Sequence, residues 1–268
     1  MPSKHRLDLH LLIKGVVTSR HKAQQLIRAG RVRDSNGKLL DKPGQEVSED
    51  LELKIKEAPR FVSRGGDKLI EAFRKFSLEV TGKICLDGGI STGGFTDCLL
   101  QQGAARVYGI DVGYGQIAWR LRNDPRVVLH ERTNLRTLTP ENLYGPNDPW
   151  PNFAVADLSF ISLKLVLPVI RSLLNPEHAE AVLLVKPQFE VGRERVGKGG
   201  VVKDVAAHVD ALHSIIVASS YQNWKAKGLI ASPIKGPAGN HEYLLWLGPK
   251  NDGDPLPNLE TLVQKTIS

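Results

Sequence analysis

From about residue 83 onward, short apolar segments that are typical of strands alternate with longer amphipathic segments that are typical of helices. The expected strands are residues 83–87, 106–111, 153–157, 181–185 and 243–247. The expected helices are residues 95–102, 117–121, 163–174 and 205–219. Because parallel strands need a crossover connection, which is usually a helix, this alternation predicts an α/β fold with a mostly parallel sheet covered by helices.

The first sixty residues follow a different pattern. Apolar residues spaced three or four apart between Arg6 and Ile27 indicate two amphipathic helices broken at Gly15. Ser19 is a suitable N-cap for the second helix. Short strand signals and a turn follow over residues 32–55, so this segment predicts a compact unit of two helices followed by strands.

The domain boundaries follow from these two patterns and from Pro59, which breaks strand pairing. We expect a small α+β domain over residues 1–56 and a linker over residues 57–62. A large domain over residues 63–248 would follow, and then a polar, peripheral tail over residues 249–268.

The formal net charge of +7 is concentrated at the N-terminus. Residues 1–33 contain eight Lys and Arg residues and one acid, Asp8, whereas the remaining 28 basic and 28 acidic residues cancel. Such a segment is typical of a surface that binds a polyanion. A solvated basic helix face is the alternative.

The sequence also indicates the compartment. No apolar run approaches the roughly 20 residues that span a bilayer, and the N-terminus leads into no signal-peptide core. We therefore expect a cytoplasmic protein. Cys85 and Cys98 lie in no CxxC motif and near no His cluster, so neither a disulfide nor a zinc site is expected.

A glycine-rich loop over residues 86–95 follows the first expected strand of the large domain and opens a helix. Glycines in such a loop let the backbone approach a ligand closely, and the helix N-terminus offers free N–H groups. A tight structural turn is the alternative. Asp111 ends the next strand, about twenty residues on, where a carboxylate can accept hydrogen bonds from ribose hydroxyls. Together these features indicate a cofactor that contains adenosine.

The details of the loop favour S-adenosylmethionine over NAD. The spacing is not G-x-G-x-x-G, and Asp87 would repel a pyrophosphate but suits the cationic amino group of a methionine moiety. Asn134 is placed to contact the adenine. The candidate cofactor-binding residues are Asp87, Gly89, Ser91, Thr92, Gly93, Gly94, Asp111, Val112 and Asn134.

Four ionisable residues are expected near the ends of strands. Lys68 precedes the first strand, Asp157 and Lys186 each follow a later strand, and Glu242 begins the last one. Because chain ends at the carboxyl edge of a parallel sheet converge on the ligand crevice, these four side chains could meet beside the transferred methyl group. Two ordinary surface ion pairs are the alternative.

The chemistry suggests a role for each of the four residues. Methylating a hydroxyl requires removal of a proton, and a lysine accepts it only in its neutral form, which burial beside a second cation favours. We assign Lys186 as the base or orienting group. Lys68 would either lower the pKa of Lys186, as the second cation, or stabilise the developing alkoxide. Asp157 and Glu242 would hold the lysines and the ribose in place. No metal is required.

Several ordered motifs resemble known families. The segments RLD (6–8), SRHKA (19–23) and LIRAG (26–30) resemble an S4 RNA-binding domain. The large domain resembles the TlyA family, whose members are known as hemolysins or as ribosomal RNA 2′-O-methyltransferases with an FtsJ-like catalytic domain. The motifs that carry this resemblance are FVSRGG (61–66), KL (68–69), STGGFTD (91–97), GIDVGYGQ (109–116), DLSFIS (157–162), LVKPQFE (184–190) and GNHE (239–242).

The resemblance covers about residues 4–248 and implies a Rossmann-like, S-adenosylmethionine-dependent methyltransferase fold. It implies a Lys-Asp-Lys-Glu catalytic set, which falls on Lys68, Asp157, Lys186 and Glu242. It also implies ribosomal RNA or a ribosomal subunit as the partner, with the 2′-hydroxyl of a cytidine as acceptor. The candidate RNA-binding residues are Arg6, Arg20, Lys22, Arg28, Arg31 and Arg64.

The sequence departs from the family pattern at two positions in the cofactor loop. Gly88 replaces a usual apolar residue, and Ile90 replaces a usual alanine, so that the larger side chain could crowd the methionine moiety. One alternative function is a non-enzymatic RNA-binding or ribosome-assembly protein with a vestigial cofactor site. A membrane-active hemolysin is a second alternative, which the lack of a spanning segment, a secretion signal or a strongly amphipathic membrane helix disfavours.

Overall fold

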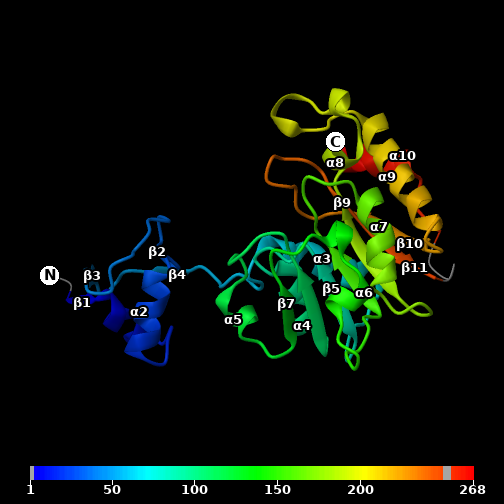
Figure 1. Cartoon of the computed structure of the whole chain (residues 1–268). Helices are drawn as coiled ribbons and strands as arrows, with labels where there is room; N and C mark the ends of the chain where they lie inside the picture. Colours follow the sequence, from blue (N-terminus) through cyan, green and yellow to red (C-terminus); the bar gives the residue numbers. More distant parts are fainter. Residues whose placement is uncertain (1–2, 250–254) are drawn as a thin grey trace. The chain divides into compact units, whose positions relative to one another are not determined.

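The computed structural model describes residues 3–249 and 255–268. The chain divides into two compact units, Met1–Pro59 and Arg60–Ser268 (Figure 1). No helix of the described residues is long and apolar enough to cross a membrane. Residues 60–62, which the sequence assigned to the linker, are attached to the second unit: Asp97 Oδ2 accepts a hydrogen bond from the Val62 N–H at 2.8 Å.

The first unit contains the two expected helices. They are separated at Gly15, which has φ +69°, and the Ser19 hydroxyl accepts a hydrogen bond from the Lys22 N–H at 3.3 Å, as predicted. The prediction that helices come first was wrong, because a strand of three residues, too short to show a pattern, precedes them and pairs with β3. The elements are β1 (Lys4–Arg6), α1 (Leu7–Ile13), α2 (Arg20–Arg28), β2 (Val32–Asp34), β3 (Glu46–Ser48) and β4 (Leu53–Ile55).

The second unit is built on a sheet of seven strands, with the order β10-β11-β9-β8-β5-β6-β7. All neighbouring pairs from β9 to β7 are parallel, and β11 is antiparallel to both of its neighbours, so the predicted mostly parallel sheet is confirmed. The strands are β5 (Ile84–Gly88), β6 (Arg106–Ile110), β7 (Val127–His130), β8 (Phe153–Ala156), β9 (Glu180–Val185), β10 (Lys225–Ala231) and β11 (Tyr243–Gly248).

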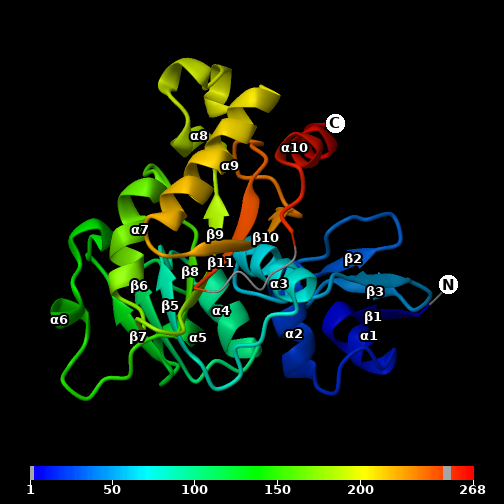
Figure 2. The same cartoon turned by 90° about the vertical axis from the view of Figure 1, so that its right-hand side faces the viewer.

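Helices cover both faces of this sheet, and two separate cores result (Figures 1 and 2). Side chains of β8 alternate between these cores: Phe153 and Val155 belong to one, Ala154 and Ala156 to the other. One core includes residues of α3 (Arg64–Phe76), α4 (Gly94–Gln101) and α5 (Trp119–Arg122). The other includes residues of α6 (Pro140–Leu143), α7 (Leu163–Ser172), α9 (Val205–Ser220) and α10 (Leu259–Ile267).

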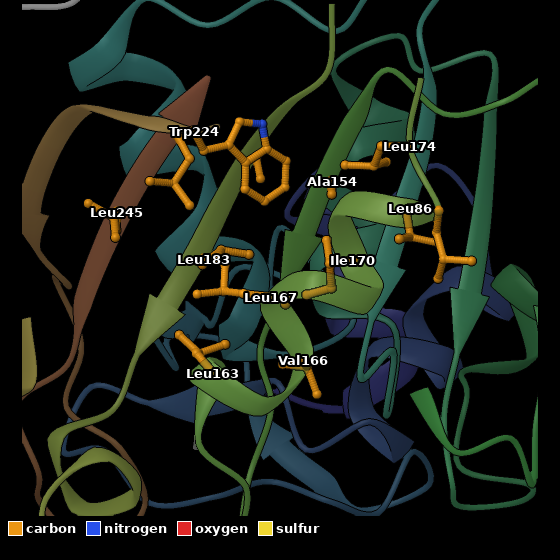
Figure 3. Packing of buried hydrophobic residues seen from close by; sticks show 14 of the residues in the cluster. Leu86, Ala154, Leu163, Val166, Leu167, Ile170, Leu174, Leu183, Trp224 and Leu245 are labelled. Atoms are coloured by element: carbon orange, nitrogen blue, oxygen red, sulfur yellow. The ribbon is translucent and has the colours of Figure 1, made fainter. Parts of the chain in front are cut away.

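Helix α7 shows why these segments become helices. Leu163, Val166, Leu167 and Ile170 recur at helical spacing, and all four are buried. Figure 3 shows this face of α7 directed at side chains of the sheet such as Leu183. Burying each such side chain contributes roughly 1.5–3 kcal/mol relative to an exposed one, so packing against the sheet holds the helix in place.

The tail beyond residue 248 is not peripheral throughout. Residues 250–254 lie outside the described residues, but α10 packs against α9, and Val263 has no exposed surface. Leu259, Leu262 and Ile267 also contact the core, which explains why a segment that reads as polar overall still folds onto the sheet.

Candidate active site

A cavity of about 510 Å³ lies at the carboxyl edge of the parallel strands. The segments that follow β5, β6, β8 and β9 all contribute to its lining. The order of the strands reverses at β5, because β6 lies on one side of β5 and β8, which comes later in the chain, lies on the other. Such a switch point is where open α/β sheets bind ligands.

The loop after β5 requires glycine for steric reasons. Gly89 has φ +82°, and a Cβ atom there would lie 2.9 Å from the Asp157 carbonyl oxygen. A Cβ atom on Gly94 would lie 2.2 Å from Ser63 Oγ, in the segment that leads into α3. The loop is therefore pressed against two other segments of the lining and tolerates no side chain at these positions.

The two departures from the family pattern each fit a neighbour. Ile90 is buried, and its Cδ1 atom lies 2.3 Å from where a Cβ atom on Gly109 would be, so the glycine of β6 makes room for the isoleucine. A Cβ atom on Gly88 would lie 3.0 Å from Leu135 Cδ2. Ile90 lines the cavity, but much of its bulk is accommodated by β6.

Asp111 closes the loop from the neighbouring strand. Its Oδ2 atom accepts a hydrogen bond from the Ser91 N–H, and its Oδ1 atom accepts one from the Gly113 N–H, both at 2.7 Å. An ionised carboxylate has about four acceptor sites, so Asp111 can still accept hydrogen bonds from a ligand in the cavity.

Asp87 has a different environment. Its side chain is fully buried, Oδ2 accepts a hydrogen bond from Thr96 Oγ1 at 2.7 Å, and Oδ1 is among the buried polar atoms without a partner in the described part of the chain. Burial raises the pKa of Asp87 to about 7, although the bond from Thr96 acts in the opposite direction.

The four ionisable residues do meet. Lys186 Nζ lies 2.5 Å from Asp157 Oδ1 and donates a hydrogen bond to Ser159 Oγ at 3.0 Å. Lys68 Nζ lies 2.6 Å from Glu242 Oε2 and 3.8 Å from Asp157 Oδ2. Both lysines are 7% exposed, Glu242 is 1% exposed and the Asp157 side chain is 24% exposed, so the four residues form one largely buried cluster, unlike two surface ion pairs.

Other predicted residues divide between the lining and its surroundings. The lining includes Gly89, Ser91, Thr92, Gly94, Asp111, Val112 and Arg64 as well as Lys68, Asp157 and Lys186. Asp87, Gly93, Asn134 and Glu242 are not part of it. Gly93 is the N-cap residue of α4, and Asn134 Oδ1 accepts a hydrogen bond from the Arg136 N–H at 3.0 Å.

The sequence reasoning missed several residues of the lining. These are Ser63, Gly65, Phe95, Ile110, Gln116, Thr133, Leu135, Leu158, Ser159, Phe160 and Pro237. Leu158, Ser159 and Phe160 follow Asp157, and Thr133 and Leu135 flank Asn134, so proximity to a predicted residue was the available signal.

The basic residues of the first unit have two kinds of environment. Arg6 and Arg20 bind the buried carboxylate of Asp8, with Nε to oxygen distances of 3.2 Å and 2.9 Å. Although burial acts in the opposite direction, these bonds and one from Gln24 hold the pKa of Asp8 well below its usual range. Lys22 and Arg28 are exposed. Arg31 Nε donates a hydrogen bond to the Lys56 carbonyl oxygen at 2.9 Å.

The fold and the cavity define a class of protein, the Rossmann-like methyltransferases. The second unit resembles an S-adenosylmethionine-dependent methyltransferase from Listeria monocytogenes, with a TM-score of 0.51 at 15% identity over 69% of this chain and 98% of that one. This likeness concerns the fold alone. Residues 61–249 match the model of the FtsJ-like methyltransferases, and residues 6–53 match the S4 domain.

Full-length relatives narrow the class to a family. The chain is 49% identical to a putative rRNA methyltransferase, YqxC, of Bacillus subtilis, over 97% of this chain and 92% of that protein. It is 46% identical to the 16S/23S rRNA (cytidine-2′-O)-methyltransferase TlyA of Mycobacterium tuberculosis, over 100% of this chain and 99% of that protein. A putative hemolysin from Streptococcus thermophilus has a TM-score of 0.72 at 40% identity, and the match covers 99% of this chain and 96% of that one. The chain therefore belongs to the TlyA family of FtsJ-like methyltransferases that carry an S4 domain.

Proposed function

We propose that the chain transfers a methyl group from S-adenosylmethionine to the ribose 2′-hydroxyl of a cytidine in ribosomal RNA. The observation that carries this proposal is the buried Lys186–Asp157–Lys68–Glu242 cluster, three of whose members also line or adjoin the cavity beside the glycine loop. The choice of cytidine and of ribosomal RNA in this proposal follows the named activity of the TlyA relative.

The cavity suits S-adenosylmethionine. Its volume falls within the roughly 300–1,000 Å³ of ordinary small-molecule sites. Asp111 retains acceptor capacity for the ribose hydroxyls of the cofactor. Bound there, S-adenosylmethionine would supply an electrophilic methyl group on its sulfonium sulfur.

The charged cluster would then handle the proton of the acceptor. Lys186 would orient the 2′-hydroxyl or accept its proton while the oxygen attacks the methyl carbon and the bond from that carbon to the sulfonium sulfur breaks. Lys68, held between Glu242 and Asp157, would stabilise the negative charge that develops on that oxygen. Asp157 binds both lysines and so fixes their spacing. A positioned base contributes typically 10²–10⁴-fold to the rate.

The first unit would bind the RNA. Lys22 and Arg28 are exposed cations on α2, and Arg31 follows this helix, so phosphate contacts here would be independent of sequence. Arg64 lines the cavity of the second unit and would contact the RNA next to the acceptor ribose. We also propose a cytoplasmic location, which a ribosomal RNA substrate would require.

Ribosomal RNA from cells that lack the gene is the substrate that tests this proposal. With tritiated S-adenosylmethionine and purified protein, we expect label in one cytidine, identified as a 2′-O-methyl nucleotide by mass spectrometry of nuclease fragments. If ribosomal RNA from cells with and without the gene carries the same set of 2′-O-methyl nucleotides, the proposal is wrong.

A binding protein without methyl transfer is the alternative to test. Calorimetry with S-adenosylmethionine separates the two functions, because a vestigial site would give no binding heat. Retained RNA binding without cofactor binding would favour a ribosome-assembly role.

A further inference from the structure

Two of the segments that contain residues of the charged cluster also contact each other through side chains outside the cluster. We call residues 157–162, which follow β8, the β8 loop, and residues 186–190, which follow β9 and contain α8 (Pro187–Glu190), the β9 turn. Lys186 of the turn contacts Asp157 and Ser159 of the loop. The Phe160 and Phe189 rings pack with their centroids 5.3 Å apart.

Glu190 makes the contact at the far end of both segments. Its Oε2 atom accepts a hydrogen bond from Ser162 Oγ at 2.6 Å, and its Oε1 atom accepts one from the Leu163 N–H at 2.8 Å. Ser162 Oγ in turn accepts a hydrogen bond from the Lys164 N–H at 3.2 Å, as the N-cap of α7. The β9 turn therefore caps the helix into which the β8 loop runs.

The β8 loop needs such a hold, because its backbone is strained. Phe160 has φ +65°, a left-handed conformation that is rare for a bulky residue, and its side chain is 92% exposed. A conformation of this kind persists only where the surroundings determine it. Asp157 anchors the start of the loop, since its N–H donates a hydrogen bond to the Gly88 carbonyl oxygen at 3.2 Å. Glu190 anchors the end.

We infer that Glu190 is a positioning residue for methyl transfer, which holds the β8 loop against the β9 turn so that Lys186 stays in contact with Asp157. This inference rests on the proposed function. Glu190 lies outside the cavity lining, whereas both segments that it joins contribute residues to that lining. Its effect on the reaction is therefore indirect, through the position of Lys186 and Asp157.

Two substitutions test the role. Glu190→Ala removes both acceptors, and we expect kcat to fall about ten- to hundredfold, because small displacements of reacting groups have effects of this size. KM for the RNA and affinity for S-adenosylmethionine should stay near wild type, since the bond between Asp111 and Ser91 of the glycine loop remains. Glu190→Gln should restore most of kcat, because its amide can accept from Leu163 N–H and donate to Ser162 Oγ.

Asn258→Ala is the matched control for lost helix capping. It removes the bond from the Thr261 N–H to Asn258 Oδ1, 2.9 Å long, which caps α10. We expect a lower free energy of unfolding and an unchanged kcat. If Glu190→Ala likewise loses stability but keeps its kcat, or if Glu190→Gln is as impaired as Glu190→Ala, the inference is overturned.

Hydrogen exchange provides a readout that does not depend on activity. The amides of residues 157–165 should exchange faster in Glu190→Ala than in wild type, and at the wild-type rate in Glu190→Gln and Asn258→Ala. Unchanged exchange in Glu190→Ala would contradict the inference. Wild-type protein without methyl transfer would instead refute the proposed function, and the exchange rates would still decide whether Glu190 holds the loop.

Discussion

Lys186 is held by two acceptors, Asp157 Oδ1 and Ser159 Oγ, and only 7% of it is exposed. We expect Lys186→Ala to lower methyl incorporation into ribosomal RNA at least about 10²-fold, because the proton acceptor of the reaction is lost. Binding of S-adenosylmethionine, measured by calorimetry, should persist. Lys225→Ala, which removes an exposed lysine of β10, is the control and should keep full activity. Undiminished transfer in Lys186→Ala would refute the assignment of the base.

Asp87 gives a second prediction at this scale. Its pKa is raised to about 7 in the folded protein from an ordinary value of 3.8, so the folded state holds a proton that the unfolded chain has lost between these values. The free energy of unfolding should therefore fall as pH rises from about 4 to about 7. Asp87→Asn removes this dependence, and its stability relative to wild type should rise over that range by on the order of 2–4 kcal/mol.

Chemical denaturation without cofactor at pH 5 and pH 8 measures this effect. Because the other titrating groups contribute equally to the unfolding free energy of both proteins, their contributions cancel in the difference at each pH. An equal difference in unfolding free energy at both pH values would show that Asp87 is ionised throughout.

Individual site residues were predictable where a side chain has a chemical signature. Asp157, Lys186 and Glu242 lie at strand ends, and strand ends converge, so their meeting follows from the α/β pattern. Lys68 instead reaches the cluster from helix α3, which the sequence did not predict. Ser159, by contrast, joins the cluster through the path of a loop, and a hydroxyl in a loop has no signature in the sequence. Sequence reasoning also placed Asp87 and Asn134 at the ligand; neither residue lines the cavity, Asp87 accepts a hydrogen bond from Thr96 of α4, and Asn134 accepts one from the Arg136 N–H.

At the scale of elements, the glycine loop after β5 depends on the absence of side chains. We expect Gly89→Ala to weaken cofactor binding and to destabilise the fold by more than the roughly 1–2 kcal/mol of a left-handed backbone alone, because its Cβ atom would also meet the Asp157 carbonyl. Gly115→Ala is the matched control: φ is +72°, but nothing lies within 4 Å of the added atom. Equal losses in both variants, by denaturation and calorimetry, would mean that backbone strain alone explains the glycine.

The elements that the sequence missed have local reasons. Helix α3 has Gly65 and Gly66 in its first turn, and because glycine is a poor helix former, they obscured the start of its amphipathic pattern. Strand β10 contains Gly228 and a register shift beside it, and a Cβ atom on that glycine would lie 2.6 Å from the Phe76 ring. Its glycine thus reflects contact with α3, which no local pattern in β10 could reveal. Long periodic segments such as α7 and α9 were predicted within a few residues.

At the scale of the whole molecule, the excess charge and the reaction site belong to different units. We expect the double variant Lys22→Gln/Arg28→Gln to bind ribosomal RNA more weakly and to lower the slope of log affinity against log salt by about 0.7–0.9 per lost phosphate contact. Its affinity for S-adenosylmethionine should not change. Filter binding at several salt concentrations and calorimetry measure the two quantities, and an unchanged salt slope would exclude these residues from the RNA contact.

Arg20 should behave differently from these two residues. Arg20→Gln removes a partner of the buried Asp8 carboxylate, so the first unit should lose stability as well as affinity for RNA. Thermal unfolding of Arg20→Gln and of the double variant distinguishes a structural arginine from a binding one. If both are equally stable, Arg6 and Gln24 suffice to hold Asp8.

The contact between Ile90 and Gly109 couples substitutions at the two positions. With isoleucine in place, a Cβ atom at position 109 would lie 2.3 Å from Ile90 Cδ1, so the end of the isoleucine side chain would have to move away. A small residue at position 90 leaves that space open. Gly109→Ala should therefore cost less stability beside Ile90→Ala than in the otherwise unchanged chain, and the two effects should not add.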